Sequence, residues 1–204
     1  MACLRGYLRG VTLTIPDPSL VLLIGPSGAG KSTFAARHFE PTEIISSDAL
    51  RAMLTNDPSD QDASAEAFRV LSMLANGRLK RRLLTVIDAT NLRVGSRKQF
   101  RQLAARYGIP TVAVAFDLPA EVFAVHNRQR PDRAVDAEVL ADQTERMRDA
   151  MADLPTEDYN ALFVLRDTAA GTTVAVDRVS RPRLASSVVP TKRRPAPSQR
   201  TLEQ

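Results

Sequence analysis

Short apolar runs separated by longer amphipathic stretches recur along most of the chain. Apolar or β-branched runs of this length, each bounded by polar or turn residues, predict strands. The predicted strands are Val11–Ile15, Leu20–Ile24, Glu43–Ser47, Leu83–Ile87, Thr111–Phe116 and Ala161–Leu165, with Thr172–Val176 as a further edge strand. Pro16 and Pro18 predict a turn between the first two strands, and the continuous run Leu83–Ile87 is typical of a strand buried on both faces.

The stretches between these strands predict helices, because their apolar positions recur at helical spacing or follow helix-start signals. They cover Thr33–Phe39, Ala49–Leu54, Ala63–Arg82, Ser96–Tyr107, Ala120–Arg130 and Asp136 to about Leu154. Strands that alternate with helices indicate an α/β fold whose sheet is mostly parallel, doubly wound and covered by flanking helices. In such a sheet, ligands bind beyond the carboxyl ends of the strands.

The most specific motif follows the second predicted strand. Residues 25–32 read Gly-Pro-Ser-Gly-Ala-Gly-Lys-Ser, which fits the phosphate-loop pattern G-x-x-x-x-G-K-[ST] between a strand and a helix. Lys31 is then expected to reach the β- and γ-phosphates of a nucleoside triphosphate, and the Ser32 hydroxyl to bind Mg²⁺. A glycine-rich turn that fits by chance is the alternative. The expected nucleotide-binding residues are Gly25, Pro26, Ser27, Gly28, Ala29, Gly30, Lys31, Ser32 and Thr33.

Two more polar clusters follow predicted strands. Asp48 comes after a strand that we expect to lie beside the strand of the phosphate loop, so it is a candidate general base, or else the N-cap of the next helix. Arg51 lies one turn later and is a candidate phosphate clamp or an exposed helix cation. Asp88 ends a strand as a Walker B acid does and is a candidate metal ligand. Thr90 and Asn91 either bind the acceptor or cap the next turn.

Three arginines surround a proline in the segment His126–Arg133. Arg128, Arg130 and Arg133 suit a helical lid whose cations neutralise charge on a transferring phosphoryl group, and the alternative is a solvated helix end. His126 and His38 show no metal-ligand spacing. The predicted fold class is therefore α/β, as a P-loop NTPase kinase fold with a helical lid.

Charge is unevenly distributed along the 204 residues. The formal net charge is +5, yet residues 181–204 hold six basic residues and one acidic residue, so the first 180 residues are balanced. Overall basicity therefore does not indicate a nucleic-acid partner for the body of the chain. We divide the chain into a P-loop kinase domain, 1–180, and a disordered, basic, proline-rich tail, 181–204.

The sequence shows no membrane-spanning run and no apolar signal-peptide core, and it has a single cysteine, Cys3. A cytoplasmic protein with no membrane partner is the expectation. Nothing in the sequence predicts the oligomeric state.

Six motifs in this order resemble the kinase domain of bacterial polynucleotide kinase-phosphatase. They are residues 25–32, Ile45-Ser-Ser-Asp48-x-x-Arg51, residues 62–68, Leu84–Asn91, Phe116–Pro119 and Asn127–Arg133, and the resemblance spans about Leu8 to Leu184. It implies transfer of the γ-phosphate of ATP or another nucleoside triphosphate, with Mg²⁺, to a 5′-hydroxyl end of DNA or RNA.

The resemblance also implies roles for individual residues. Lys31 and Ser32 would bind the phosphates and the metal, and Asp48 would be the general base. Arg51 would bind a substrate phosphate near the 5′ end, and Arg130 would be a lid arginine. His126 replaces the arginine that the family usually has there. The larger relatives continue into phosphatase and ligase-like modules, whereas this chain continues into its low-complexity tail.

Two other functions remain open at this level. The same fold and chemistry suit a small-molecule hydroxyl acceptor, as in sugar, antibiotic or zeta-toxin-like kinases. An ATP-binding adaptor whose basic tail tethers a nucleic acid or another partner is the third hypothesis. The sequence does not discriminate between DNA and RNA, nor between nucleobases.

Overall fold

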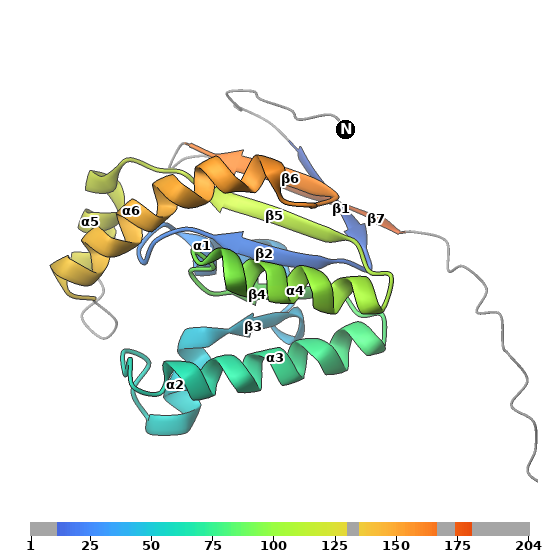
Figure 1. Cartoon of the computed structure of the whole chain (residues 1–204), viewed down its shortest axis with the longest axis horizontal. Coiled ribbons are helices and arrows are strands. Elements are labelled where there is room, and N and C mark those ends of the chain that lie inside the picture. Colours follow the sequence, from blue (N-terminus) through green and yellow to red (C-terminus); the bar gives the residue numbers. More distant parts are fainter. Residues whose placement is uncertain (1–11, 130–134, 167–173, 181–204) are drawn as a thin grey trace, which may run out of the picture.

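The computed structural model describes residues 12–129, 135–166 and 174–180. Its centre is a sheet of five parallel strands in the order β3–β4–β2–β5–β6 (Figure 1). The strands are β2 (Leu20–Ile24), β3 (Ile44–Ser46), β4 (Thr85–Asp88), β5 (Thr111–Phe116) and β6 (Ala161–Leu165). The mostly parallel α/β architecture predicted from the alternating pattern is confirmed.

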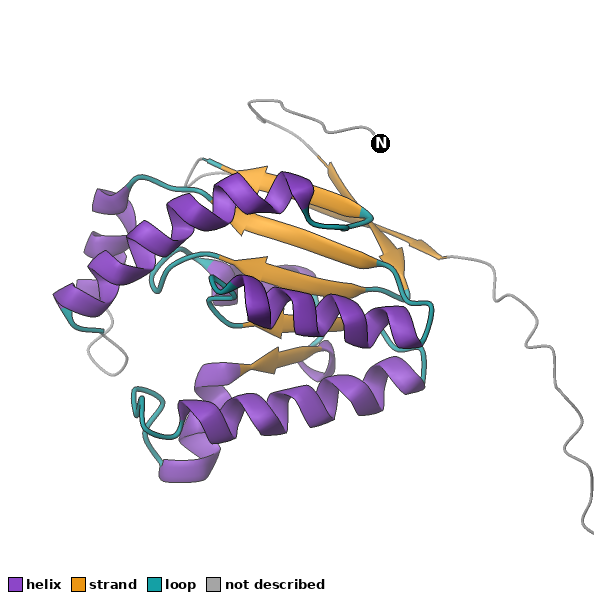
Figure 2. Cartoon of the chain, viewed as in Figure 1, coloured by secondary structure: helices purple, strands orange, loops and turns teal. Residues whose placement is uncertain are grey.

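The helices predicted from the sequence are present, with ends that differ by a few residues (Figure 2). They are α1 (Lys31–His38), α2 (Ser47–Thr55), α3 (Ser64–Lys80), α4 (Val94–Arg106), α5 (Ala120–Arg128) and α6 (Ala137–Asp153). Two short 3₁₀ helices, η1 (Pro41–Glu43) and η2 (Leu154–Thr156), complete the set of described helices. None of the helices described is long and apolar enough to cross a membrane.

Both faces of the sheet are buried, which explains the continuous apolar runs of its central strands. Every residue of β2 and β5 is buried. Leu20, Leu22 and Ile24 point to one side, where they join a core with residues of α3, α4 and α6. Val21 and Leu23 point to the other side, where they pack in a second core with residues of α1 and β1. Alternation along each strand thus feeds two separate cores.

The first and last described strands form a small sheet of their own. β1 (Thr12–Asp17) pairs in parallel with β7 (Ala175–Ser180), with Thr12 opposite Ala175. β1 extends through Pro16, where the sequence predicted a turn. β7 continues past the predicted end at Val176, and the predicted start at Thr172 lies outside the described residues. This pairing joins segments from the two ends of the chain, so no local pattern could predict it.

One expectation about the sheet order is wrong. β3, which leads to Asp48, does not lie beside β2, because β4 is inserted between them. The parallel register nevertheless places Asp88 of β4 opposite Leu23 of β2 on one side and opposite Ser46 of β3 on the other. The three polar clusters at the strand ends are therefore brought to one edge of the sheet.

Candidate active site

A cavity of about 860 Å³ lies at this edge. The phosphate loop, α2, the connection after α2, the end of β4 and one face of α6 line it. Of the residues predicted from the sequence, the cavity brings together Ser27, Gly28, Gly30, Lys31, Ser32, Asp48, Arg51, Asp88, Thr90 and Asn91. Two candidate catalytic groups and the phosphate loop thus face a common space.

The phosphate loop adopts a conformation that glycine permits, as Gly28 and Gly30 show. Gly28 has φ +83° and Gly30 has φ +88°, values that side chains with a Cβ rarely adopt. Gly30 is the N-cap residue of α1, and no side chain caps this helix end. The positive N-terminal end of α1 therefore faces the phosphate loop without a side-chain cap, as in anion-binding helix ends.

Lys31 is the first residue of α1, and its side chain folds back onto the start of the phosphate loop rather than into solvent. Its side chain is nearly buried, and its Nζ donates hydrogen bonds to the carbonyl oxygens of Gly25 at 2.9 Å and Pro26 at 2.7 Å. The backbone N–H of Ser27 donates to Oε1 of Gln143 on α6 at 2.7 Å. The side-chain oxygen of Gln143 thus occupies the Ser27 N–H of the phosphate loop.

Asp88 is a nearly buried carboxyl group, 5% exposed, beside Ser32. Burial raises the pKa of Asp88, while the charge of Lys31 and the hydroxyls of Ser32 and Ser46 oppose the rise. A carboxylate and a hydroxyl at the edge of a phosphate-binding loop are oxygen ligands of the kind that Mg²⁺ takes together with substrate phosphates. The residues present therefore fit a nucleotide-bound Mg²⁺.

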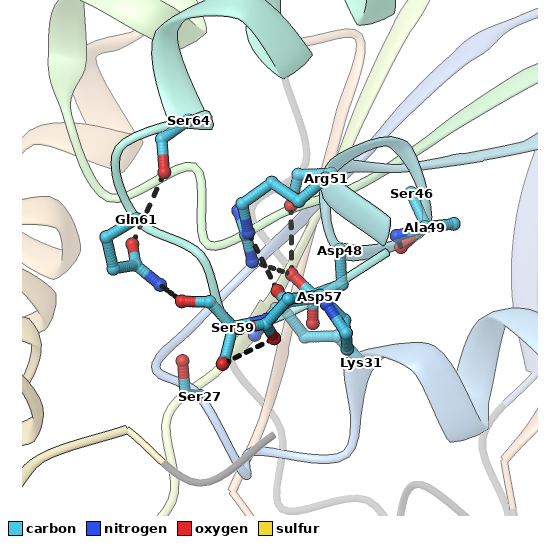
Figure 3. Close-up of polar contacts among 12 residues, drawn as sticks. Ser27, Lys31, Ser46, Asp48, Ala49, Arg51, Asp57, Ser59, Gln61 and Ser64 are labelled. Carbon is cyan, nitrogen blue, oxygen red and sulfur yellow. Dashed lines mark hydrogen bonds and ion pairs between the residues drawn. The ribbon is translucent and has the colours of Figure 1, made fainter. Parts of the chain in front are cut away.

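Asp48 and Arg51 form an ion pair on the first turns of α2, facing the phosphate loop (Figure 3). The N-cap of α2 is Ser46, whose hydroxyl accepts the Ala49 N–H at 3.5 Å, so the N-cap interpretation of Asp48 is wrong. Arg51 is not an exposed cation either, since its side chain is only 12% exposed. Its Nε donates to the Pro58 carbonyl at 2.8 Å and ties the connection after α2 to the cavity wall.

Thr90 and Asn91 join the end of β4 to β2. The backbone N–H of Gly25 donates to the Thr90 carbonyl at 3.0 Å, and Nδ2 of Asn91 donates to the Leu23 carbonyl at 2.7 Å. The fully buried Arg97 donates to the Asn91 carbonyl and forms an ion pair with Glu157. Asn91 therefore holds the strand ends together rather than offering its amide nitrogen to an acceptor.

The segment with the candidate lid arginines is only partly described. Arg128 lies at the exposed end of α5 and does not line the cavity, whereas Arg130 and Arg133 lie outside the described residues. His126 contacts the phosphate loop directly, with Nδ1 3.1 Å from the Gly28 carbonyl oxygen. The position where the family usually has an arginine is thus packed against the loop.

Sequence reasoning missed the contribution of α6. Val139, Asp142, Gln143 and Arg146 of this helix line the cavity, as does Arg93 before α4. Asp142 and Arg146 form an ion pair with Oδ2 and Nε 2.6 Å apart. The spacing of these four α6 residues puts them on one helix face, and the three polar residues among them are the only signal in the sequence.

Fold and site together define a P-loop phosphotransferase, in which a nucleotide-binding loop faces charged side chains across a cavity. A model of the AAA domain family matches residues 20–154, and the chain belongs to this family of P-loop kinases. Nucleotide binding follows from this membership. A search of curated proteins gives no match.

Several solved structures share the fold. A putative kinase from Chloroflexus aurantiacus has a TM-score of 0.53 and 15% identity, covering 74% of this chain and 88% of that chain. A chain of the Pnkp1/Rnl/Hen1 RNA repair complex has a TM-score of 0.59 and 21% identity, covering 71% and 48% respectively. The PezAT toxin-antitoxin system of Streptococcus pneumoniae gives 0.50 and 18%, covering 78% and 71%. The present chain therefore spans about half of the RNA repair chain.

Proposed function

We propose that this kinase transfers the γ-phosphate of ATP, or of another nucleoside triphosphate, to the 5′-hydroxyl end of DNA or RNA. The observation that carries the proposal is the Asp48–Arg51 pair, which faces the phosphate loop across the same cavity. A carboxylate next to a guanidinium suits an acceptor that presents a hydroxyl group beside a phosphate. The 5′ end of a polynucleotide has this chemistry.

In this proposal the phosphate loop and Lys31 hold the triphosphate, and Ser32 and Asp88 hold Mg²⁺. The metal, when bound, neutralises charge that develops on the transferring phosphoryl group. Arg130 contributes a lid cation, and Arg128 and Arg133 add contacts to the nucleotide. These lid roles rest on the family resemblance alone.

Asp48 and Arg51 would act in sequence. A substrate phosphate competes with Asp48 for the Arg51 guanidinium, which leaves the Asp48 carboxylate to accept a hydrogen bond from the 5′-hydroxyl. Asp48 then takes the proton of the 5′-hydroxyl while the oxygen of that hydroxyl bonds to the γ-phosphorus. The bond from this phosphorus to the bridging oxygen breaks, and the nucleoside diphosphate leaves.

The test is transfer of a labelled γ-phosphate to short DNA and RNA oligonucleotides with a 5′-hydroxyl. The same oligonucleotides with a 5′-phosphate are the matched acceptor control, and Lys31→Ala is the inactive-enzyme control. We expect label on the 5′-hydroxyl ends alone. Label on small hydroxylated compounds, with none on either oligonucleotide, would contradict the proposal.

A small-molecule hydroxyl is the second candidate acceptor, and the charge of the cavity favours it. Four cationic side chains line the cavity, and so do four carboxylates: Lys31, Arg51, Arg93 and Arg146, against Asp48, Asp62, Asp88 and Asp142. A polynucleotide must displace some of these carboxylates from their cations, whereas a neutral acceptor need not. Polynucleotide binding weakens steeply with salt because counterions are released, and binding of a neutral acceptor does not.

A further inference from the structure

The contact between Gln143 and Ser27 joins two parts of the chain that lie 116 residues apart in sequence. Gln143 projects from α6 and accepts the backbone N–H of Ser27, the third residue of the phosphate loop, at 2.7 Å. Because it touches the loop that binds the nucleotide, its chemistry bears on the bound phosphates.

The helix that carries Gln143 is held near the phosphate loop by packing of the backbone. Gly28 lies so close to α5 that an added Cβ would be 2.5 Å from the Phe123 carbonyl oxygen. Asn127, near the end of α5, then pairs with both backbone groups of Val135, just before α6, at 2.8 and 3.1 Å. The loop, α5 and the start of α6 are therefore joined by short contacts.

The carboxamide of Gln143 has a second function available. Its Oε1 is occupied by the Ser27 N–H, whereas Nε2 carries two donor hydrogens on the same planar group. Among the residues that the structure describes, none accepts a hydrogen bond from this nitrogen. Gln143 is one of the residues that line the cavity.

The geometry of Lys31 indicates which phosphate the carboxamide would meet. A phosphate-loop lysine reaches the β- and γ-phosphates, and here Nζ lies against the carbonyls of Gly25 and Pro26, directly before Ser27. The Ser27 amide and Gln143 therefore lie at the end of the loop that the Lys31 Nζ reaches. The inner phosphates belong to the other end, at the first amides of α1.

We propose that Gln143 recognises the terminal phosphoryl group of the bound nucleoside triphosphate. Oε1 stays on the Ser27 N–H, which fixes the carboxamide plane, and Nε2 donates to a γ-phosphate oxygen. Gln143 thereby distinguishes a triphosphate from a diphosphate. This rests on the nucleotide-binding part of the proposed function and not on the identity of the acceptor.

The test measures binding of the non-hydrolysable β,γ-imido analogue of ATP and of ADP, each with Mg²⁺, by titration calorimetry without any acceptor. Gln143→Ala should weaken analogue binding roughly tenfold to hundredfold, the range for a hydrogen bond to a charged group, and should leave ADP binding nearly unchanged. Gln143→Glu keeps the acceptor oxygen but replaces the donor with a negative charge, so it should weaken analogue binding further. Gln102→Ala, on the exposed face of α4 and outside the cavity, is the matched control.

Three results would overturn the proposal. Equal loss of analogue and ADP binding in Gln143→Ala, with a lower unfolding temperature, would assign Gln143 to packing alone. Tighter binding of both nucleotides would mean that Gln143 competes with the phosphates for the Ser27 N–H. Wild-type protein that binds neither nucleotide would overturn it together with nucleotide binding itself. If only the oligonucleotide assay fails, the acceptor is wrong, but Gln143→Ala should still weaken analogue binding much more than ADP binding.

Discussion

The contact of α5 with the phosphate loop makes a sharp prediction about two glycines. Gly28 and Gly30 both have a positive φ, so alanine at either position carries the same backbone strain of about 1–2 kcal/mol. Only Gly28 is crowded. A Cβ there would lie 2.5 Å from the Phe123 carbonyl oxygen and 3.2 Å from the Asn127 nitrogen, whereas a Cβ at Gly30 meets nothing within 4 Å.

We therefore expect Gly28→Ala to be the more destabilising change. Forcing a methyl group into a packed backbone contact adds about 1–3 kcal/mol to the strain that both variants share. In a chain of this length about 1 kcal/mol corresponds to a shift of about 2–4 °C in unfolding temperature. The unfolding temperature of Gly28→Ala should accordingly lie several degrees below that of Gly30→Ala.

Thermal unfolding of the two variants and the wild type, followed by circular dichroism without nucleotide, makes the comparison. Urea unfolding gives the corresponding free energies. Equal losses for the two variants would contradict this prediction, because the extra cost at Gly28 comes entirely from its contact with α5. A larger loss at Gly30 would refute it as well.

Three further predictions concern buried charge. Burial raises the pKa of Asp88, so Asp88→Asn should raise the unfolding temperature of the nucleotide-free protein, and a lower unfolding temperature would contradict this. The same substitution should abolish Mg²⁺-dependent transfer. Burial lowers the pKa of His38 below its ordinary 6.5, so folding stability should fall as pH drops below that value. His38→Gln should reduce this loss in unfolding temperatures measured from pH 5 to 8. A pH profile unchanged by the substitution would contradict the prediction. Arg97→Ala leaves the nearly buried Glu157 without its main partner and should cost about 3–5 kcal/mol in urea unfolding, where a loss below about 1 kcal/mol would be contrary.

The core of the fold is readable in the sequence because it depends on local signals. Strands buried on both faces, such as Thr111–Phe116, are continuous apolar runs. The phosphate loop is recognised by the spacing of its glycines and Lys31. Asp48 and Asp88 are recognisable because carboxylates directly after strands are conspicuous. Periodicity and motif spacing carry this information without knowledge of the tertiary structure.

The rest depends on contacts between distant segments. The pairing of β1 with β7 and the insertion of β4 between β3 and β2 leave no local trace in composition. Gln143 looks like any polar residue on a long helix until α6 lies against Ser27. The burial of Arg97 is equally invisible, because its partner Glu157 lies 60 residues away.

The most direct test of Asp48 as the general base is the turnover number of Asp48→Asn with nucleotide and acceptor both saturating. Asparagine keeps the size of the side chain but cannot take the hydroxyl proton, so kcat should fall about 10²–10⁴-fold, the usual contribution of a general base, while nucleotide affinity stays near that of the wild type. Asp158→Asn, an exposed residue outside the cavity, is the matched control. A kcat for Asp48→Asn close to that of Asp158→Asn would contradict the central claim that Asp48 activates the acceptor.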